Sequence, residues 1–195
     1  MSDERRNQGR DRAPRSGPKP LNLARLEELA LAYVARFATT QAKLRLYLQR
    51  KLRERGWDGE DAPPVDELVG RYARLGYVND AAWAHMKAGS LLRRGYGARR
   101  VGEALGQAGV SEDLRATERP GQSDQRRAAL VLARRRRFGP FAVHRADSAA
   151  DPRLRDKQLA AMLRAGHPLD IARRIVESED VAMLEEWAES EFGDD

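Results

Sequence analysis

Residues 79–110 decide the fold, and they read NDAAWAHMKAGSLLRRGYGARRVGEALGQAGV. Asn79 is a residue type that caps helix N-termini, and apolar residues then recur every three or four positions as far as Leu91. A second apolar stripe follows the break Gly95-Tyr96-Gly97 and consists of Val101, Leu105 and Ala108. The stripe ends at Gly109, and glycine is the residue type that most often stops a helix. The stretch therefore predicts two amphipathic helices joined by a tight break.

The same pattern recurs on both sides of this stretch. Helical stripes end at Gly56, Gly109 and Gly166, which are 53 and 57 residues apart. Apolar residues precede each glycine, although Gln158 replaces the apolar residue expected in the last copy. A unit of this length that recurs favours stacked repeats. The sequence therefore predicts an all-α fold, an extended modular array of about three three-helix repeats followed by an acidic C-terminal helix.

The predicted boundaries follow from composition. Residues 1–20 are basic, contain three prolines and lack apolar periodicity, so we expect a disordered arm. The helical repeats are predicted at 21–77, 78–118 and 119–178, and an acidic cap helix or tail at 179–195. Residues 115–122 and 143–151 are polar and without periodicity, which predicts hinges between the units. No segment alternates apolar and polar residues, so we expect essentially no sheet.

Positive and negative charges are unevenly distributed along the chain. The net charge is +6, but from Glu177 onward there are nine acids and neither lysine nor arginine. A strongly basic body favours a polyanionic partner, which is nucleic acid, an acidic protein surface or both. The alternative is that arginine serves only as a solubilising cation. With no cysteine, no signal-like segment and no apolar run long enough to cross a bilayer, we expect a cytoplasmic protein without a membrane partner.

Two arginine clusters are the candidate partner-binding residues. Arg93, Arg94, Arg99 and Arg100 flank the break that holds Tyr96, and guanidinium groups pair well with phosphates and carboxylates. The alternative is a helix junction with Tyr96 in the core. The second cluster lies near a predicted helix end and consists of Arg134, Arg135, Arg136 and Arg137. The alternative is that these arginines form a solvated helix face and complement the helix dipole.

The sequence offers little for catalysis. His85, His144 and His167 are isolated and lack metal-ligand spacing, and there is no phosphate-binding loop and no nucleophile elbow. The Gly-x-Gly at Gly95 follows a predicted helix instead of a strand, so it is not a dinucleotide-binding fingerprint. We therefore predict that the protein is no enzyme and needs no metal and no cofactor.

Residues 22–178 resemble the RecX family of bacterial recombination regulators. The resemblance rests on LRRGYGARRVGEALGQAGV at 92–110, RFGP at 137–140 and DPRLRDKQLAAMLRAGHPLDIARRIV at 151–176. It implies an extended protein of three-helix units that lies in the groove of the RecA–DNA filament and lowers its recombinase, ATPase and co-protease activities. We expect a monomer, because a modular array presents no obvious self-complementary patch. The chain departs from the family in having Ala98 where proline is common, and Gly102 and Gly106 inside a helix. A stand-alone nucleic-acid-binding protein remains the alternative.

Overall fold

We describe a computed structural model of the protein at residues 19–142 and 151–190. Within those ranges the chain forms ten α-helices and one short 3-10 helix, and its sole β feature is an isolated bridge between Leu21 and Trp57. The all-α prediction is therefore confirmed. The basic arm predicted at 1–20 lies almost wholly outside the described residues, as do the hinge at 143–150 and the last five residues of the acidic segment.

The first three helices are α1 (Leu23–Arg36), α2 (Gln41–Arg55) and α3 (Val65–Arg74), and we call them the N-terminal bundle. Thr40 caps α2, because its side chain accepts a hydrogen bond from the backbone N–H of Lys43. Gly56 ends the helix with a φ of 81°, a conformation that favours glycine. The bundle closes over its own core, made of Leu21, Leu26, Ala30, Leu44, Leu48, Val65, Leu68, Val69, Tyr72 and Val78.

The central bundle consists of α4 (Asp80–Arg93), α5 (Ala98–Gln107) and α6 (Glu112–Thr117). Asn79 caps α4 by accepting a hydrogen bond from the backbone N–H of Ala82. The hinge predicted at 115–122 is wrong in part, because Arg115 to Thr117 belong to α6 and Gln122 already begins α7. Ser111 caps α6, and the six-residue helix was too short for a periodic signal. The core of this bundle consists of Trp83, Ala84, Ala88, Leu91, Val101, Leu105, Ala108 and Val110.

The C-terminal bundle contains α7 (Gln122–Arg136), η1 (Gly139–Phe141), α9 (Pro152–Arg164), α10 (Leu169–Glu177) and α11 (Val181–Glu189). Leu184 and Trp187 of α11 are buried in the core of this bundle, so the acidic helix packs as a cap on it. Gln158, the departure from the repeat pattern, is also buried, and its Oε1 accepts a 2.9 Å hydrogen bond from the backbone N–H of Gly139. A polar residue is needed there to satisfy the RFGP turn.

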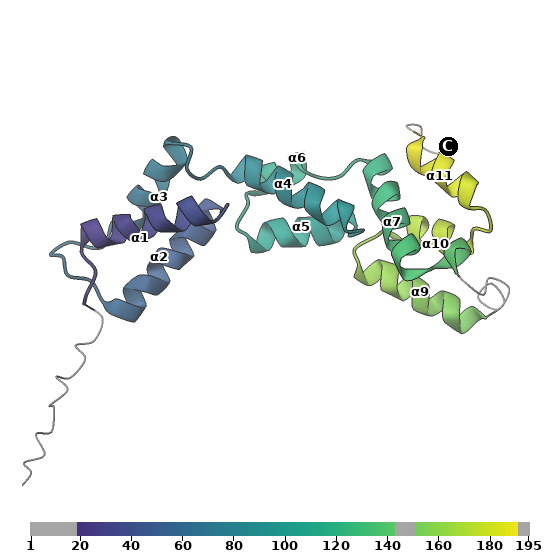
Figure 1. Ribbon diagram of the computed structural model, residues 1–195, viewed down its shortest axis with the longest axis horizontal. Helices are drawn as coiled ribbons and strands as arrows, with labels where there is room; N and C mark the ends of the chain where they lie inside the picture. The colour runs from purple at the N-terminus through teal and green to yellow at the C-terminus, as the bar shows by residue number, and fades with distance from the viewer. Residues whose placement is uncertain (1–18, 143–150, 191–195) are drawn as a thin grey trace, which may run out of the picture.

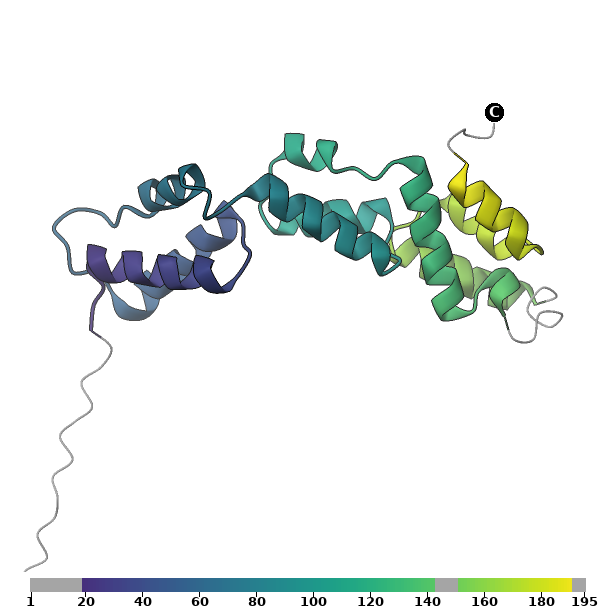
Figure 2. The same ribbon diagram turned by 45° about the horizontal axis from the view of Figure 1, so that its top comes forward.

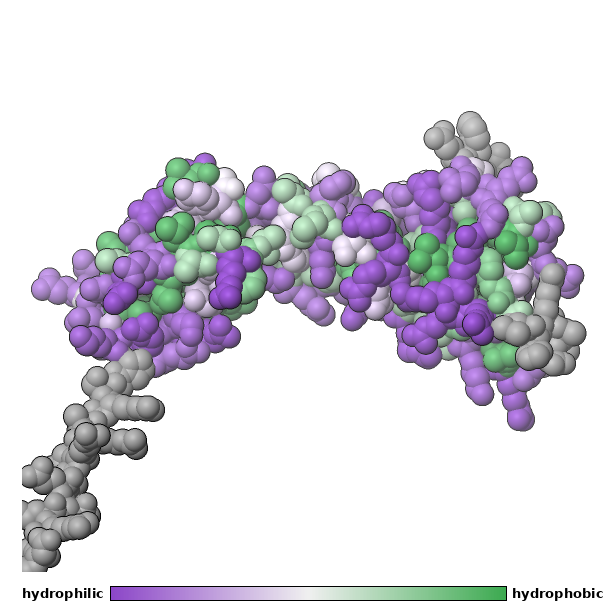
Figure 3. All heavy atoms as spheres, viewed as in Figure 1, coloured by the Kyte–Doolittle hydropathy of each residue, from purple (hydrophilic) through white to green (hydrophobic). Residues whose placement is uncertain are grey.

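The bundles lie in a row, so the molecule is elongated (Figures 1 and 2). Each bundle has a core of its own, and we propose that the three bundles are the three repeats predicted from the sequence. The surface seen in Figure 3 is largely hydrophilic, with apolar patches on its left and right parts. Some residues of the predicted apolar stripes lie on that surface instead of in a core: Phe37 (52% exposed), Leu75 (61%) and Met86 (49%).

The N-terminal and central bundles meet where the end of α5 lies against the start of α2. Thr40, which caps α2, also donates a 2.6 Å hydrogen bond from its Oγ1 to the carbonyl oxygen of Ala108. Gly109 follows with a φ of 73°, and a Cβ added there would overlap with the Cβ of Ala42. The helix-stopping glycine of the central bundle therefore also permits this close contact.

Candidate polyanion-binding site

The Gly-Tyr-Gly break is first of all a junction between the central and C-terminal bundles. The backbone N–H of Gly97 donates a 2.9 Å hydrogen bond to the carbonyl oxygen of Ala165, at the end of α9. The Arg99 guanidinium donates a second hydrogen bond, of 2.7 Å, to the carbonyl oxygen of Leu163. This junction repeats the arrangement of the first one, since the end of a later helix again lies against the start of an earlier one.

Glycine is required at this junction because the two backbones touch. A Cβ added to Gly97 would overlap with the carbonyl of Gly166. Gly166 has a φ of 95°, and a Cβ there would lie 2.5 Å from the backbone nitrogen of Arg100. A Cβ on Gly95, which has a φ of 79°, would lie 2.8 Å from the backbone nitrogen of Leu132 in α7. Because real Cβ atoms almost never approach this closely, a side chain at these positions would push the bundles apart.

A groove opens on the central bundle beside this junction, and we call it the basic groove. It has a volume of about 420 Å³ and reaches from α2 across α4 to α5. Its cationic side chains come from all three of those helices or their ends: Lys43, Lys87, Arg94 and Arg100. Two aromatic rings, those of Trp83 and Tyr96, lie among them. Within the described part of the chain, no carboxylate lines the groove.

Electrostatic repulsion inside the basic groove is visible at Lys43. Its Nζ lies 4.3 Å from the centre of the Trp83 ring, a cation–π contact. Burial lowers the pKa of Lys43, and the positive charge of Lys87 lowers that pKa further. Both causes disfavour the ammonium form, and a bound anion would relieve the repulsion. The groove therefore concentrates positive charge on one side of the central bundle.

The predicted cluster around the break divides between the groove and the junction. Arg94, Tyr96 and Arg100 line the basic groove, and the Arg94 guanidinium lies 5.3 Å from the centre of the Tyr96 ring. Arg99 instead ties the junction, and Glu103 on the same helix pairs with both Arg99 and Arg100. Arg93 is exposed at the end of α4 and does not line the groove.

Sequence reasoning missed two of the four cations of the basic groove, Lys43 and Lys87. Trp83, Lys87, Leu91 and Arg94 follow one another at spacings of four, four and three residues, which places them on one face of α4. The combination of cations and an aromatic residue on one helix face could have indicated a binding surface on α4 before the structure was known. Lys43 carried no such signal, because it comes from another bundle and reaches the groove only through the tertiary fold.

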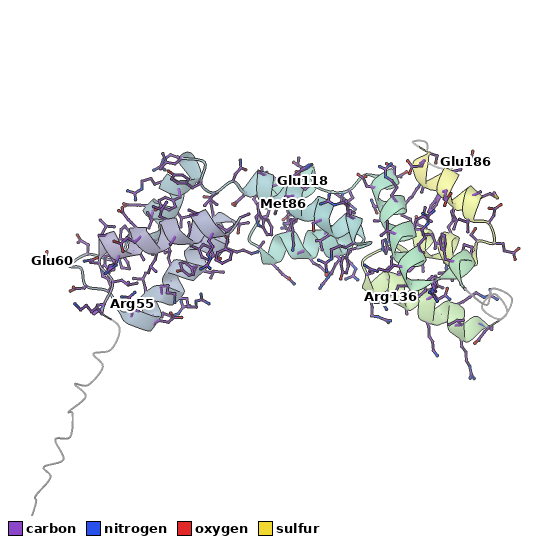
Figure 4. All side chains as sticks on the ribbon, in the orientation of Figure 1. Arg55, Glu60, Met86, Glu118, Arg136 and Glu186 are labelled. Carbon is purple, nitrogen blue, oxygen red and sulfur yellow. The ribbon has the colours of Figure 1, made fainter. Side chains whose placement is uncertain are left out.

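The arginine run of α7 does not form a single site. Arg134 pairs with Glu185 of α11, and its guanidinium lies 5.5 Å from the centre of the Phe141 ring, so its contacts lie within the C-terminal bundle. Arg135 and Arg136 are exposed, and Figure 4 places Arg136 on the C-terminal bundle. Arg137 ends α7 with a φ of 58°. None of the four lines the basic groove.

Metal and membrane chemistry find no support in the described residues. Over residues 19–142 and 151–190, no group of three or more histidine, aspartate and glutamate side chains is placed to hold a metal ion. No helix in those ranges is long and apolar enough to span a bilayer.

The row of bundles and the groove define an elongated all-α protein with a basic surface site. The crystal structure of RecX from Lactobacillus salivarius shares this fold with a TM-score of 0.63, over 82% of this chain and 97% of that one, at 18% sequence identity. Regulatory protein RecX of Myxococcus xanthus is 32% identical over 90% of this chain and 98% of its own length. Regulatory protein RecX of Pseudomonas putida is 30% identical over 70% of this chain.

These likenesses establish the family. The chain belongs to the RecX family of regulatory proteins. No protein-family model matches the sequence.

Proposed function

We propose that the protein binds the RecA–DNA filament and restrains its recombinase, ATPase and co-protease activities. The basic groove carries the proposal, because four cations without a lining carboxylate form a surface that attracts the phosphates or acidic side chains of such an assembly. Membership of a family of regulatory proteins supports a role in control, without catalysis by the chain itself.

The elongated shape also supports a filament partner. Three bundles in a row present a long surface, so a single chain contacts more than one subunit of a repeating assembly. Both junctions are held by hydrogen bonds to a backbone carbonyl oxygen, from the Thr40 hydroxyl to Ala108 and from the Gly97 N–H to Ala165. A row of bundles joined in this way retains its length without a partner, which lowers the entropic cost of binding.

A stand-alone nucleic-acid-binding protein is the second candidate function. The basic groove favours it equally, because phosphates of free DNA would satisfy the same cations. Sequence-specific reading of duplex bases is disfavoured, since Gln107 is the one amide side chain that the described residues place in the groove.

An ATPase assay separates the two candidates. The full chain is added to RecA with ATP and single-stranded DNA, and its binding to the same DNA without RecA is measured in parallel. We expect the ATPase rate to fall at protein concentrations below those that saturate free DNA. An unchanged ATPase rate together with tight binding to free DNA would establish the second candidate instead. The protein with ATP and DNA alone is the control for hydrolysis of its own.

A further inference from the structure

We propose that the basic groove continues onto α1 and α2 as a track for a single nucleic-acid strand, with phosphates on the cations and unstacked bases on the exposed ring of Phe37 and on the open edges of the half-buried tyrosine rings. The inference rests on the proposed function, because the strand that we place in the groove is the DNA of the RecA–DNA filament. It assigns the groove to the DNA strand and not to an acidic surface of the recombinase.

The track begins on one face of α2. This face carries a strip of four residues, which are Lys43, Tyr47, Arg50 and Lys51. Tyr47 follows Lys43 by four residues, and Arg50 and Lys51 follow Tyr47 by three and four, so the side chains are neighbours on the helix surface. Lys43 lines the basic groove and therefore connects the strip to it. The Arg50 guanidinium and the Lys51 ammonium lie 5.7 and 6.0 Å from the centre of the Tyr47 ring. The ring of Tyr47 thus lies among cations on α2, and Glu54 pairs with Arg50 and Lys51 at the far end of the strip.

Three rings of α1 and α2 form an aromatic platform beside this strip. The rings of Tyr33 and Tyr47 are stacked, with centroids 4.2 Å apart and planes 17° from parallel. Phe37 extends the platform, 5.4 Å from Tyr33, and is 52% exposed at the end of α1. The hydrophobic effect disfavours such an exposed ring, and the core of the N-terminal bundle closes without Phe37. A nucleobase that stacks on the ring would cover it.

The other end of the track repeats the combination of ring and cation. The Arg94 guanidinium lies over Tyr96, and Arg94 and Arg100 are both exposed to solvent. A guanidinium plane stacks with a base on one face while its N–H groups contact a phosphate. From Phe37 to Arg100 the chain therefore presents rings and cations in alternation over two bundles.

This alternation selects a single strand over other polyanions. Bases in a duplex are already stacked and paired, so their faces are closed to side chains, whereas a single strand offers every base face. An acidic peptide would satisfy the cations but has no flat ring to cover Phe37 or Tyr47. A duplex or an acidic peptide would therefore use only the cationic half of the track.

Fluorescence anisotropy of the full chain tests the proposal with three probes: labelled oligothymidylate, a duplex of the same length and polyglutamate of matched charge. Phe37→Ala removes an exposed ring, and Phe37→Trp retains one. Leu46→Ala is the matched control, because Leu46 is a 60% exposed apolar residue of α2 outside the strip. We expect Phe37→Ala to weaken oligothymidylate binding about tenfold. Duplex binding should be unaffected by this change, and Phe37→Trp and Leu46→Ala should bind oligothymidylate as the natural chain does.

Two results would overturn the track. One is oligothymidylate binding by Phe37→Ala that equals that of the natural chain; the other is polyglutamate binding as tight as oligothymidylate binding. The ATPase assay keeps the two proposals apart. A natural chain that inhibits RecA normally while Phe37→Ala binds oligothymidylate unchanged would remove the track and leave filament regulation intact. If Phe37→Ala weakens oligothymidylate binding but the natural chain does not inhibit the RecA ATPase, the track is retained and filament regulation is excluded.

Discussion

Nε2 of His167 donates a 3.0 Å hydrogen bond to the carbonyl oxygen of Gly95, and this bond fixes the Gly-Tyr-Gly break against the turn between α9 and α10. A carbonyl only accepts, so the imidazole carries its proton on Nε2. Nδ1 is buried and has no hydrogen-bond partner in the described structure. Burial lowers the pKa of His167 below its ordinary value near 6.5, and the hydrogen bond to Gly95 opposes that lowering in part.

Acid should therefore loosen this junction. Above pH 6.5 the imidazole is neutral in the folded and the unfolded chain, and the stability is complete. As the pH falls from 6.5 through the lowered pKa, the unfolded chain takes up the proton first and the stability is lost. We expect the melting temperature to fall between pH 7.5 and 5.5, and to fall less in His167→Gln, whose amide retains a donor but does not titrate. An equal fall in both proteins would exclude His167 as the cause. His85→Gln, at an exposed histidine, is the control.

Two glycines of the same region should respond oppositely to alanine. Gly97→Ala places a Cβ against the carbonyl of Gly166, which we expect to cost roughly 2 kcal/mol or more of unfolding free energy. Gly102→Ala lies inside α5 with no atom within 4 Å of the new Cβ, so it should stabilise the chain by about 1 kcal/mol. Urea unfolding of both variants measures the difference. Equal effects of the two substitutions would show that the bundles do not touch at Gly97.

The sequence was informative where structure is set locally. Asn79 marked a helix start, and Gly56, Gly109 and Gly166 marked stops, because capping and a positive φ depend on neighbouring residues in the chain. The sequence was uninformative where structure is set by contacts between bundles. The role of Arg99 at the junction, the place of Lys43 in the groove and the exposure of Phe37 all depend on residues distant in sequence.

Deleting α11 should destabilise the C-terminal bundle. A chain that ends at Ser178 loses two buried apolar side chains, Leu184 and Trp187, each worth roughly 1.5–3 kcal/mol. It also leaves the Arg126 guanidinium, which is 7% exposed, without the Trp187 carbonyl oxygen to which it donates a 3.0 Å hydrogen bond. The truncated chain therefore loses both apolar burial and this hydrogen bond. Circular dichroism during heating should show a melting temperature several degrees lower.

The acidic charges of α11 can be tested without removing its core contacts. A variant with Glu185→Gln, Glu186→Gln and Glu189→Gln loses exposed ion pairs only, so we expect a shift in unfolding free energy below about 1 kcal/mol. If the acidic helix competes with the partner, this variant should bind oligothymidylate more tightly at low salt. Unchanged affinity together with an unchanged melting temperature would show that α11 serves only as a cap.

Inhibition of the RecA ATPase by two charge-reversed variants tests the central claim, that the basic groove contacts the filament. Lys87→Glu with Arg94→Glu reverses two cations of the groove, and Arg135→Glu with Arg136→Glu makes the same change in charge at exposed positions of α7. Both pairs lie on the surface or at its edge, and matching melting temperatures would show that both variants are folded. We expect the groove variant to need at least tenfold more protein for half-inhibition at moderate salt, while the α7 variant inhibits nearly as well as the natural chain. Full inhibition by the folded groove variant, with loss of inhibition in the α7 variant, would contradict the account and move the contact to the C-terminal bundle.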